Sequence, residues 1–234
     1  MDRTISLDMR KNTLQLVLLL MIVVNVFAPA AFADSRAKIL VVGDSLSAGL
    51  NLNVKDTWVA LLQTRLDAKG YGYRLVNASI SGDTTSNGLS RLPRAIDLHQ
   101  PEIVIIELGA NDGLRGLPIE IMQDNLAQMI RKSQDSGARV VLAGMLMPPN
   151  YGEDYTERFA AAYPQLAKEF AIPLIPFFLE GVALDPSLLQ EDGLHPNEQA
   201  QPLLMETVWT TLEPVLQKAT AAQGGGSSQA VATR

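Results

Sequence analysis

Short apolar runs alternate with amphipathic stretches between residues 37 and 218. Strands are predicted where the runs are continuous, over residues 38–42, 73–78, 102–108, 139–145 and 173–178. Helices are predicted where apolar residues recur at helical spacing, over residues 58–66, 89–98, 119–136, 155–170 and 197–216. Strands that are apolar on both faces and alternate with helices are typical of parallel sheets covered on both sides. The pattern therefore predicts an α/β fold, a three-layer α/β/α sandwich with a five-stranded, mostly parallel sheet.

Both ends of the chain depart from this pattern. Residues 1–33 combine a positively charged start, an apolar run over residues 14–27 and small residues around Ala33. This order is typical of a secretory signal peptide, and the run is shorter than the roughly 20 residues that span a bilayer. We therefore expect cleavage near Ala33, a periplasmic or secreted protein, and no integral membrane span after processing. Residues 219–234, rich in small residues, predict a disordered tail after a single domain over residues 34–218.

Composition excludes several classes of site. The 234 residues include no cysteine and only two histidines, and the formal net charge is −6. Without cysteine there is no disulfide, no thiol nucleophile and no cysteine-held metal. The negative charge argues against a nucleic-acid partner, whose phosphates need neutralising by basic residues. We expect no cofactor, no metal site and a monomeric protein.

Polar residues with catalytic chemistry follow four of the predicted strands. Ser45 follows the first strand, Gly82 the second and Asn111 the third, while Asp192 and His195 follow the fifth. Ligands of parallel α/β sheets bind beyond the carboxyl ends of the strands. We therefore expect these five residues to meet at one edge of the sheet.

Three of these residues have the chemistry of a catalytic triad. A serine hydroxyl becomes a nucleophile only when a base takes its proton. Asp192 stands three residues before His195, a spacing that lets its carboxylate hold the imidazole in one tautomer. His99 precedes a strand, at the opposite edge of the sheet, and is interpreted as structural. Taken alone, Ser45 is more typical of a helix N-cap, so the Asp–His pair is what favours the nucleophile.

Gly82 and Asn111 are candidate donors for an oxyanion hole, together with the backbone N–H of Ser45. Acyl transfer places negative charge on the carbonyl oxygen, which preoriented donors stabilise. Gly82 lacks a Cβ, so its N–H can approach closely, and the Asn111 amide supplies a further donor. Turn geometry alone explains each of these two residues equally well.

The segments after the third and fourth strands predict an acyl pocket. Leu114 and Arg115 follow the asparagine, and Met145, Met147 and Pro148 follow the fourth strand. Methionine forms an adaptable apolar lining that suits a fatty acyl chain, although core packing explains these methionines equally well. Arg115 either meets a phosphate or is solvated.

Four blocks resemble, in order, those of the SGNH (GDSL-type) hydrolases. They are GDSLSAG (43–49), SISGDTT around Gly82, GANDGLRG (109–116) and DGLHP (192–196). The resemblance implies a flavodoxin-like hydrolase domain with Ser45 as nucleophile, Asp192 and His195 completing the triad, and Gly82 and Asn111 as oxyanion donors. Further stretches, PPNYG (148–152) and IPFF (175–178), resemble exported bacterial members of that family. The implied substrates are small-molecule or lipid acyl esters: acyl-CoA, lysophospholipids and aryl esters.

Other functions stay open at this point. A carbohydrate or acetyl esterase on the same fold would have a small, polar pocket, which the methionine-rich segment disfavours. A non-catalytic domain could bind Mg²⁺ through Asp44, Asp83 and Asp112, which follow three different strands, although no paired acidic motif supports it. The α/β-hydrolases share the order Ser, Asp, His, but the Gly-x-Ser-x-Gly elbow they require is absent around Ser45.

Overall fold

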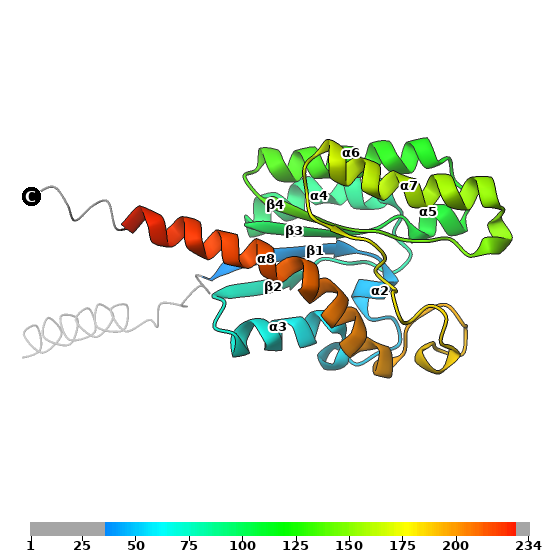
Figure 1. Ribbon diagram of the computed structural model, residues 1–234, viewed down its shortest axis with the longest axis horizontal. Coiled ribbons are helices and arrows are strands. Elements are labelled where there is room, and N and C mark those ends of the chain that lie inside the picture. The colour runs from blue at the N-terminus through cyan, green and yellow to red at the C-terminus, as the bar shows by residue number, and fades with distance from the viewer. Residues whose placement is uncertain (1–35, 228–234) are drawn as a thin grey trace, which may run out of the picture. The chain divides into compact units, whose positions relative to one another are not determined.

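A computed structural model describes residues 36–227, and the predicted signal peptide lies outside them. Its sheet has five strands in the order β2-β1-β3-β4-β5, and each strand is parallel to its neighbours (Figure 1). The strands are β1 (Ala37–Gly43), β2 (Tyr73–Asn77), β3 (Ile103–Glu107), β4 (Arg139–Ala143) and β5 (Leu174–Ile175).

Helices cover both faces of this sheet (Figure 1). On one face α3 (Trp58–Ala68) packs against α8 (Gln201–Ser227), and on the other α6 (Ile119–Asp135) packs between α4 (Thr85–His99) and α7 (Glu153–Glu169). The short helices α2 (Ser45–Ala48) and α5 (Ala110–Leu114) follow β1 and β3. Single 3₁₀ turns are η1 (Val54–Asp56), η2 (Pro149–Tyr151), η3 (Pro186–Leu188) and η4 (Glu198–Ala200). The predicted three-layer α/β/α sandwich is confirmed.

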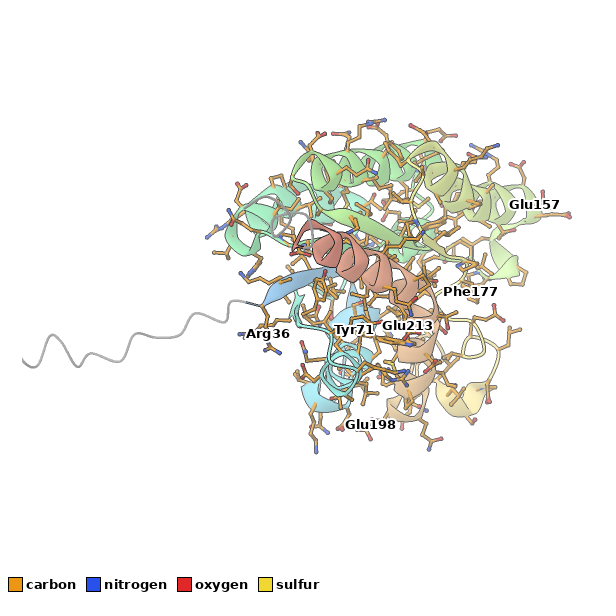
Figure 2. All side chains as sticks on the ribbon, turned by 60° about the vertical axis from the view of Figure 1, so that its left-hand side comes forward. Arg36, Tyr71, Glu157, Phe177, Glu198 and Glu213 are labelled. Atoms are coloured by element: carbon orange, nitrogen blue, oxygen red, sulfur yellow. The ribbon has the colours of Figure 1, made fainter. Side chains whose placement is uncertain are left out.

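The two central strands form the middle of the core. Residues 39–42 of β1 and 103–106 of β3 are completely buried, as expected for strands covered on both faces. Aromatic contacts join the α3 and α8 layer to the rest: Trp58 meets Phe178 edge to face, with ring centroids 5.6 Å apart. Tyr71, labelled in Figure 2, packs in the same way against Trp209 of α8 at 5.9 Å.

The strand order creates a switch point between β1 and β3. From β1 the chain moves outward to β2, then returns to β3 on the other side of β1. The connecting helices α3 and α4 therefore lie on opposite faces, which leaves a crevice beyond the carboxyl ends of β1 and β3. Ser45 lies two residues after the end of β1, and Asn111 lies four residues after the end of β3. The fold therefore places both residues beside this crevice.

Three elements differ most from the predicted boundaries. The helix predicted from residue 89 begins at Thr85, because Thr84 and Asn87 form a reciprocal capping box inside a segment that resembles a loop. The fifth strand is two residues long, since Pro173 and Pro176 on either side of it have no N–H to donate to the sheet.

The last helix, α8, runs beyond residue 216 to Ser227, so the first part of the segment predicted as a disordered tail is helical. Alanines predominate at the start of that segment and favour continuation of the helix. None of the helices within residues 36–227 combines the length and apolar character needed to cross a membrane.

Candidate active site

Ser45 is held by a tight turn at the end of β1. It is the first residue of α2, and the Asp44 carboxylate before it accepts the Leu46 N–H at 3.0 Å. Gly43 leaves no room for a side chain, since a Cβ there would lie 2.5 Å from Glu107 Oε2. The chain thus passes directly from the buried strand to a serine that is 9% exposed.

The hydroxyl of Ser45 contacts the imidazole of His195. Ser45 Oγ lies 2.8 Å from His195 Nε2, and His195 Nδ1 lies 2.6 Å from Asp192 Oδ2. With the carboxylate on Nδ1, that nitrogen carries the proton and Nε2 can accept one. The structure therefore brings the three predicted triad residues into one hydrogen-bonded chain.

The loop carrying Asp192 and His195 is fastened to the segment after α2. Gln190 donates its side-chain amide to Leu50 O and to Pro196 O, both at 3.0 Å, and Asn51 donates to the Gln190 side chain at 3.1 Å. The backbone N–H of Gln190 also donates to His195 O at 2.7 Å. Gln190 thus sets the position of the imidazole relative to Ser45.

Asp192 is held in its ionised form. Its Oδ1 accepts the backbone N–H groups of His195 at 3.0 Å and Leu194 at 2.9 Å. The His195 backbone N–H is the main cause that lowers the pKa of Asp192 to about 2, followed by the His195 side chain and the Leu194 N–H. An anionic partner is what stabilises the imidazolium that forms during acyl transfer.

Of the predicted oxyanion donors, Ser45 and Asn111 line the cavity beside the nucleophile, and Gly82 lies in a turn joined to the end of β1. Gly82 lies in a turn closed by the Asp83 N–H donating to Ile80 O at 3.1 Å, and its φ of 83° suits glycine. The Ile80 N–H in turn donates to Gly43 O at 3.1 Å, which ties this turn to the end of β1. Within the described residues, neither the Ser45 N–H nor the Gly82 N–H donates to another protein atom, so both are free for a ligand.

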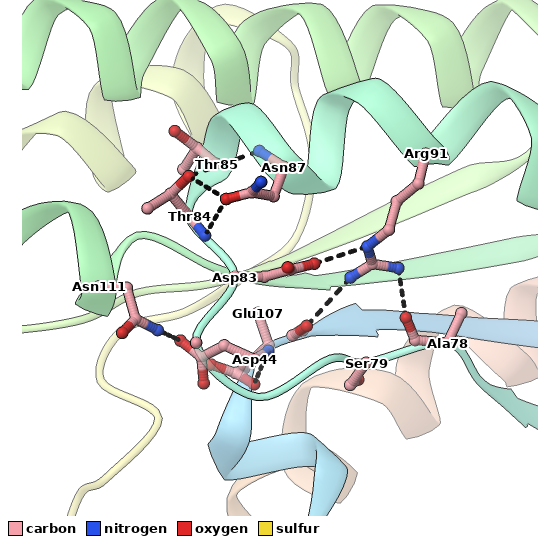
Figure 3. A network of polar contacts seen from close by, with 12 residues as sticks. Asp44, Ala78, Ser79, Asp83, Thr84, Thr85, Asn87, Arg91, Glu107 and Asn111 are labelled. Atoms are coloured by element: carbon pink, nitrogen blue, oxygen red, sulfur yellow. Dashed lines mark hydrogen bonds and ion pairs between the residues drawn. The ribbon is translucent and has the colours of Figure 1, made fainter.

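Two buried carboxyl groups lie behind the nucleophile. Asp44 Oδ2 accepts the Asn111 side-chain amide at 3.0 Å (Figure 3). Glu107 Oε2 accepts the Ser47 hydroxyl at 2.5 Å. Burial raises the pKa of Asp44 to about 6, and burial beside Asp44 raises the pKa of Glu107 well above its ordinary value. These carboxyl groups orient the Asn111 amide and the α2 turn, roles that sequence reasoning missed because the contacts are long-range.

A cavity of about 370 Å³ opens beside Ser45, Asn111 and His195. Its walls are mainly apolar and come from the segments that follow β3, β4 and β5. They include Leu114, Met145, Met147, Pro148, Phe177, Leu179, Leu184 and Leu189. The last four residues were not predicted as pocket residues: Phe177 lies inside the predicted fifth strand, and the three leucines follow that strand.

Arg115 does not line this cavity with the other predicted pocket residues. It caps the end of α5, and its Nη2 donates to Gly82 O at 2.9 Å. The prediction that Arg115 belongs to the acyl pocket is therefore wrong, because the side chain turns toward the Gly82 turn.

The three aspartates of the metal-binding alternative have separate partners. Asp44 accepts from Leu46 and Asn111, Asp83 pairs with Arg91 at 2.6 Å, and Asp112 accepts the Thr85 hydroxyl at 2.6 Å. In the part of the chain that the structure describes, no three His, Asp or Glu side chains converge to hold a metal ion. These aspartates therefore give the metal-binding alternative no support.

Known proteins share this sequence and fold. Residues 41–202 match the GDSL-like lipase/acylhydrolase family. The chain is 52% identical over 178 residues to esterase TesA of Pseudomonas aeruginosa, covering 76% of this chain and 89% of that protein. It is 44% identical over 187 residues to thioesterase 1/protease 1/lysophospholipase L1 of Escherichia coli, covering 80% of this chain and 87% of that protein.

The fold of this chain is also similar to that of a solved structure. The psychrotrophic esterase EstA from Pseudoalteromonas sp., inhibited by monoethylphosphonate, superposes with a TM-score of 0.74 at 40% identity. The alignment covers 77% of this chain and 98% of EstA. Since the family match runs from residue 41 to residue 202, and so includes both Ser45 and His195, and since relatives of 40–52% identity cover about three quarters of the chain, the chain belongs to the GDSL-like lipase/acylhydrolase family.

Proposed function

We propose that this protein is a serine hydrolase that cleaves carboxylic esters and thioesters through an acyl-enzyme. Ser45 is the nucleophile, His195 the general base and Asp192 the group that orients and stabilises the imidazole. The observation that carries this proposal is the hydrogen-bonded chain from Ser45 through His195 to Asp192 at the mouth of an apolar cavity.

Acylation begins with proton transfer. His195 Nε2 takes the proton of the Ser45 hydroxyl as Oγ attacks the acyl carbonyl carbon. The negative charge that develops on the carbonyl oxygen is stabilised by the N–H groups of Ser45 and Gly82 and by the Asn111 amide. The intermediate collapses, the thiolate or alkoxide takes the proton from His195, and the acyl group stays on Ser45.

Deacylation repeats these steps with water. His195 takes a proton from a water molecule, whose oxygen attacks the acyl carbon of the ester on Ser45. The same three donors stabilise the second oxyanion. When the C–O bond to Ser45 breaks, the proton returns from His195 to Oγ and the carboxylic acid leaves.

The cavity favours substrates with an apolar acyl group. Methionine, leucine and phenylalanine side chains form most of its wall, and a polar sugar or a lone acetyl group would leave that apolar surface exposed to water. The relatives named esterase TesA and thioesterase 1/protease 1/lysophospholipase L1 support esters and thioesters as the substrate class. Acyl-CoA, lysophospholipid and aryl esters are therefore the first substrates to test, ahead of acetylated carbohydrates.

Substitution of the nucleophile tests the proposal. Ser45→Ala is expected to lower kcat on aryl esters by at least about 10⁴-fold, since the triad acts as a unit. Ser86→Ala, on the exposed side of α4, is the matched control and should retain wild-type kcat. Substantial hydrolysis by folded Ser45→Ala would refute the assignment. A panel of acyl-CoA, lysophosphatidylcholine and aryl esters of increasing chain length defines the preferred acyl group.

We also propose that residues 1–33 are a signal peptide and that the mature protein is periplasmic or secreted and monomeric. The charge pattern and length of the apolar run support export. N-terminal sequencing of the protein recovered from the periplasm or medium should give Asp34 as the first residue. Light scattering of the purified mature chain tests the monomer.

A further inference from the structure

Arg91 of α4 joins the two backbone segments that carry the free N–H donors. Its guanidinium reaches three acceptors: Gly43 O at 3.2 Å, Ala78 O, and the Asp83 carboxylate at 2.6 Å (Figure 3). Gly43 ends β1, two residues before Ser45, whereas Ala78 and Asp83 stand on either side of Gly82. One side chain therefore contacts the backbone before the nucleophile and both ends of the Gly82 turn.

Apart from the Ile80 N–H that donates to Gly43 O at 3.1 Å, the turn has few other contacts that fix its position. Gly82 itself is exposed, and its contact beyond the loop is Gly82 O accepting from the exposed Arg115. By contrast, Arg91 and Asp83 are largely buried, with side chains 21% and 12% exposed. Hydrogen bonds to charged groups that are shielded from water are stronger than exposed ones. Arg91 is thus a charged, largely buried side-chain link between the Gly82 turn and β1, beside the backbone hydrogen bond from Ile80 to Gly43.

We propose that Arg91 is a positioning residue of the oxyanion hole, which fixes the Gly82 N–H relative to the Ser45 N–H. This inference rests on the proposed function, because it assigns Arg91 a role in stabilising the oxyanion of acyl transfer. Displacement of a donor by about 1 Å can lower a rate by about 100-fold. The guanidinium suits this task because its planar fork addresses three acceptors in fixed directions, which a lysine ammonium on a flexible stem cannot do.

Arg91→Lys tests the role while keeping the charge. The expected result is a decrease in kcat of roughly 10- to 100-fold with KM nearly unchanged, since the apolar acyl cavity is left intact. Arg94→Lys, exposed on the same helix, is the matched control and should retain wild-type kcat. Titration of active sites with a phosphonate ester separates slow catalysis from unfolding, because it counts competent Ser45 residues.

A double-mutant cycle separates positioning of Gly82 from general support of the fold. Gly82→Ala perturbs the same donor, so combining it with Arg91→Lys should cost much less than the product of the two single effects. Asn111→Ala removes a different donor, so its effect should multiply with that of Arg91→Lys. A purely structural role would give the same pattern with both partners.

Each outcome decides the inference. A kcat for Arg91→Lys within twofold of wild type overturns it, and so does a loss that disappears once rates are divided by titrated active sites. If Arg91→Lys does not fold, Asp83→Asn keeps both carbonyl contacts and should lower kcat about 3- to 10-fold, and an unchanged kcat there also overturns it. Activity in Ser45→Ala would instead refute the proposed function itself.

Discussion

At the scale of single residues, the side-chain amide of Asn111 has two N–H groups with different partners: one donates to Asp44, and the other is available to the substrate oxyanion. One N–H donates to Asp44 Oδ2 at 3.0 Å, and an amide nitrogen carries a second N–H. Because the buried carboxyl fixes the orientation of the amide, the second N–H can be aimed without a loss of rotamer freedom during the reaction. Asp44 therefore contributes to the site through Asn111, in addition to capping the turn of Ser45.

Asn111→Ala tests the amide as an oxyanion donor. We expect kcat on aryl esters to fall by about 10²- to 10³-fold, as removal of one such donor typically does, with a small change in KM. Asn53→Ala, exposed before η1 with no side-chain capping bond, is the control. A decrease below about fivefold in the folded variant would contradict the assignment of Asn111.

Sequence spacing explains which site residues could be predicted. Asp192 and His195 stand three residues apart, so their contact can be predicted from their spacing in the sequence. Arg91 and Glu107 reach partners 48 and 60 residues away, and no local pattern marks them. Arg115 was misassigned for a related reason: the segment to which it belongs lines the cavity, but its side-chain direction depends on the Gly82 turn.

At the scale of elements, the pairing of β4 with β5 depends on the close approach of the Gly144 backbone to the Pro176 backbone. A Cβ on Gly144 would lie 2.4 Å from Pro176 O, a backbone atom that cannot turn aside. Gly144 also donates to Ile175 O at 2.8 Å and accepts the Phe178 N–H at 2.9 Å, which continues the pairing past the two-residue strand. This glycine lets the segment with Phe177, marked in Figure 2, lie against β4 and form part of the cavity wall.

We expect Gly144→Ala to lower the free energy of unfolding by about 1–3 kcal/mol, the usual cost of overpacking. Urea unfolding followed by tryptophan fluorescence measures this change. Gly72→Ala is the control, since a Cβ there meets nothing within 4 Å and should leave stability nearly unchanged. Equal stabilities for the two variants would show that the β4–β5 edge can separate without cost.

Elements were predicted best where the hydrophobic pattern alone determines them. The 102–108 run became β3 (Ile103–Glu107) because its residues are buried on both faces. The start of α4 was not predicted because its capping residues are also typical of turns. The length of β5 was overestimated because the prolines that flank it interrupt the regular pairing of a strand. Periodicity identifies which elements exist, while polar capping and missing N–H groups set their ends.

At the scale of the whole molecule, buried and exposed carboxyl groups act oppositely on stability as pH changes. Asp192, with its pKa lowered to about 2, stabilises the folded chain above pH 3.8, and this contribution is lost as the pH falls toward 2. Asp44, with its pKa raised from 3.8 to about 6, stabilises the folded chain at low pH instead. Its neutral form is favoured by folding, so the unfolded chain releases this proton first and stability falls as pH rises through 6.

Asp44→Asn should therefore gain stability relative to wild type as the pH rises. Between pH 4 and pH 7 we expect the difference in free energy of unfolding to change by at least about 1 kcal/mol in favour of the variant. Urea titrations at several pH values measure it. Asp97→Asn removes an exposed carboxylate and serves as the control. A difference independent of pH would show that Asp44 ionises alike in both states.

The order of the site residues along the chain also determines when activity can begin. Ser45 and His195 lie 150 positions apart, with the nucleophile near the start of the domain and its base near the end. During synthesis Ser45 is therefore made long before His195. A truncated or unfolded chain lacks the general base beside Ser45, so its serine hydroxyl is not a nucleophile. Activity therefore begins only when the loop that carries His195 has folded against Leu50 and brought the imidazole to Ser45.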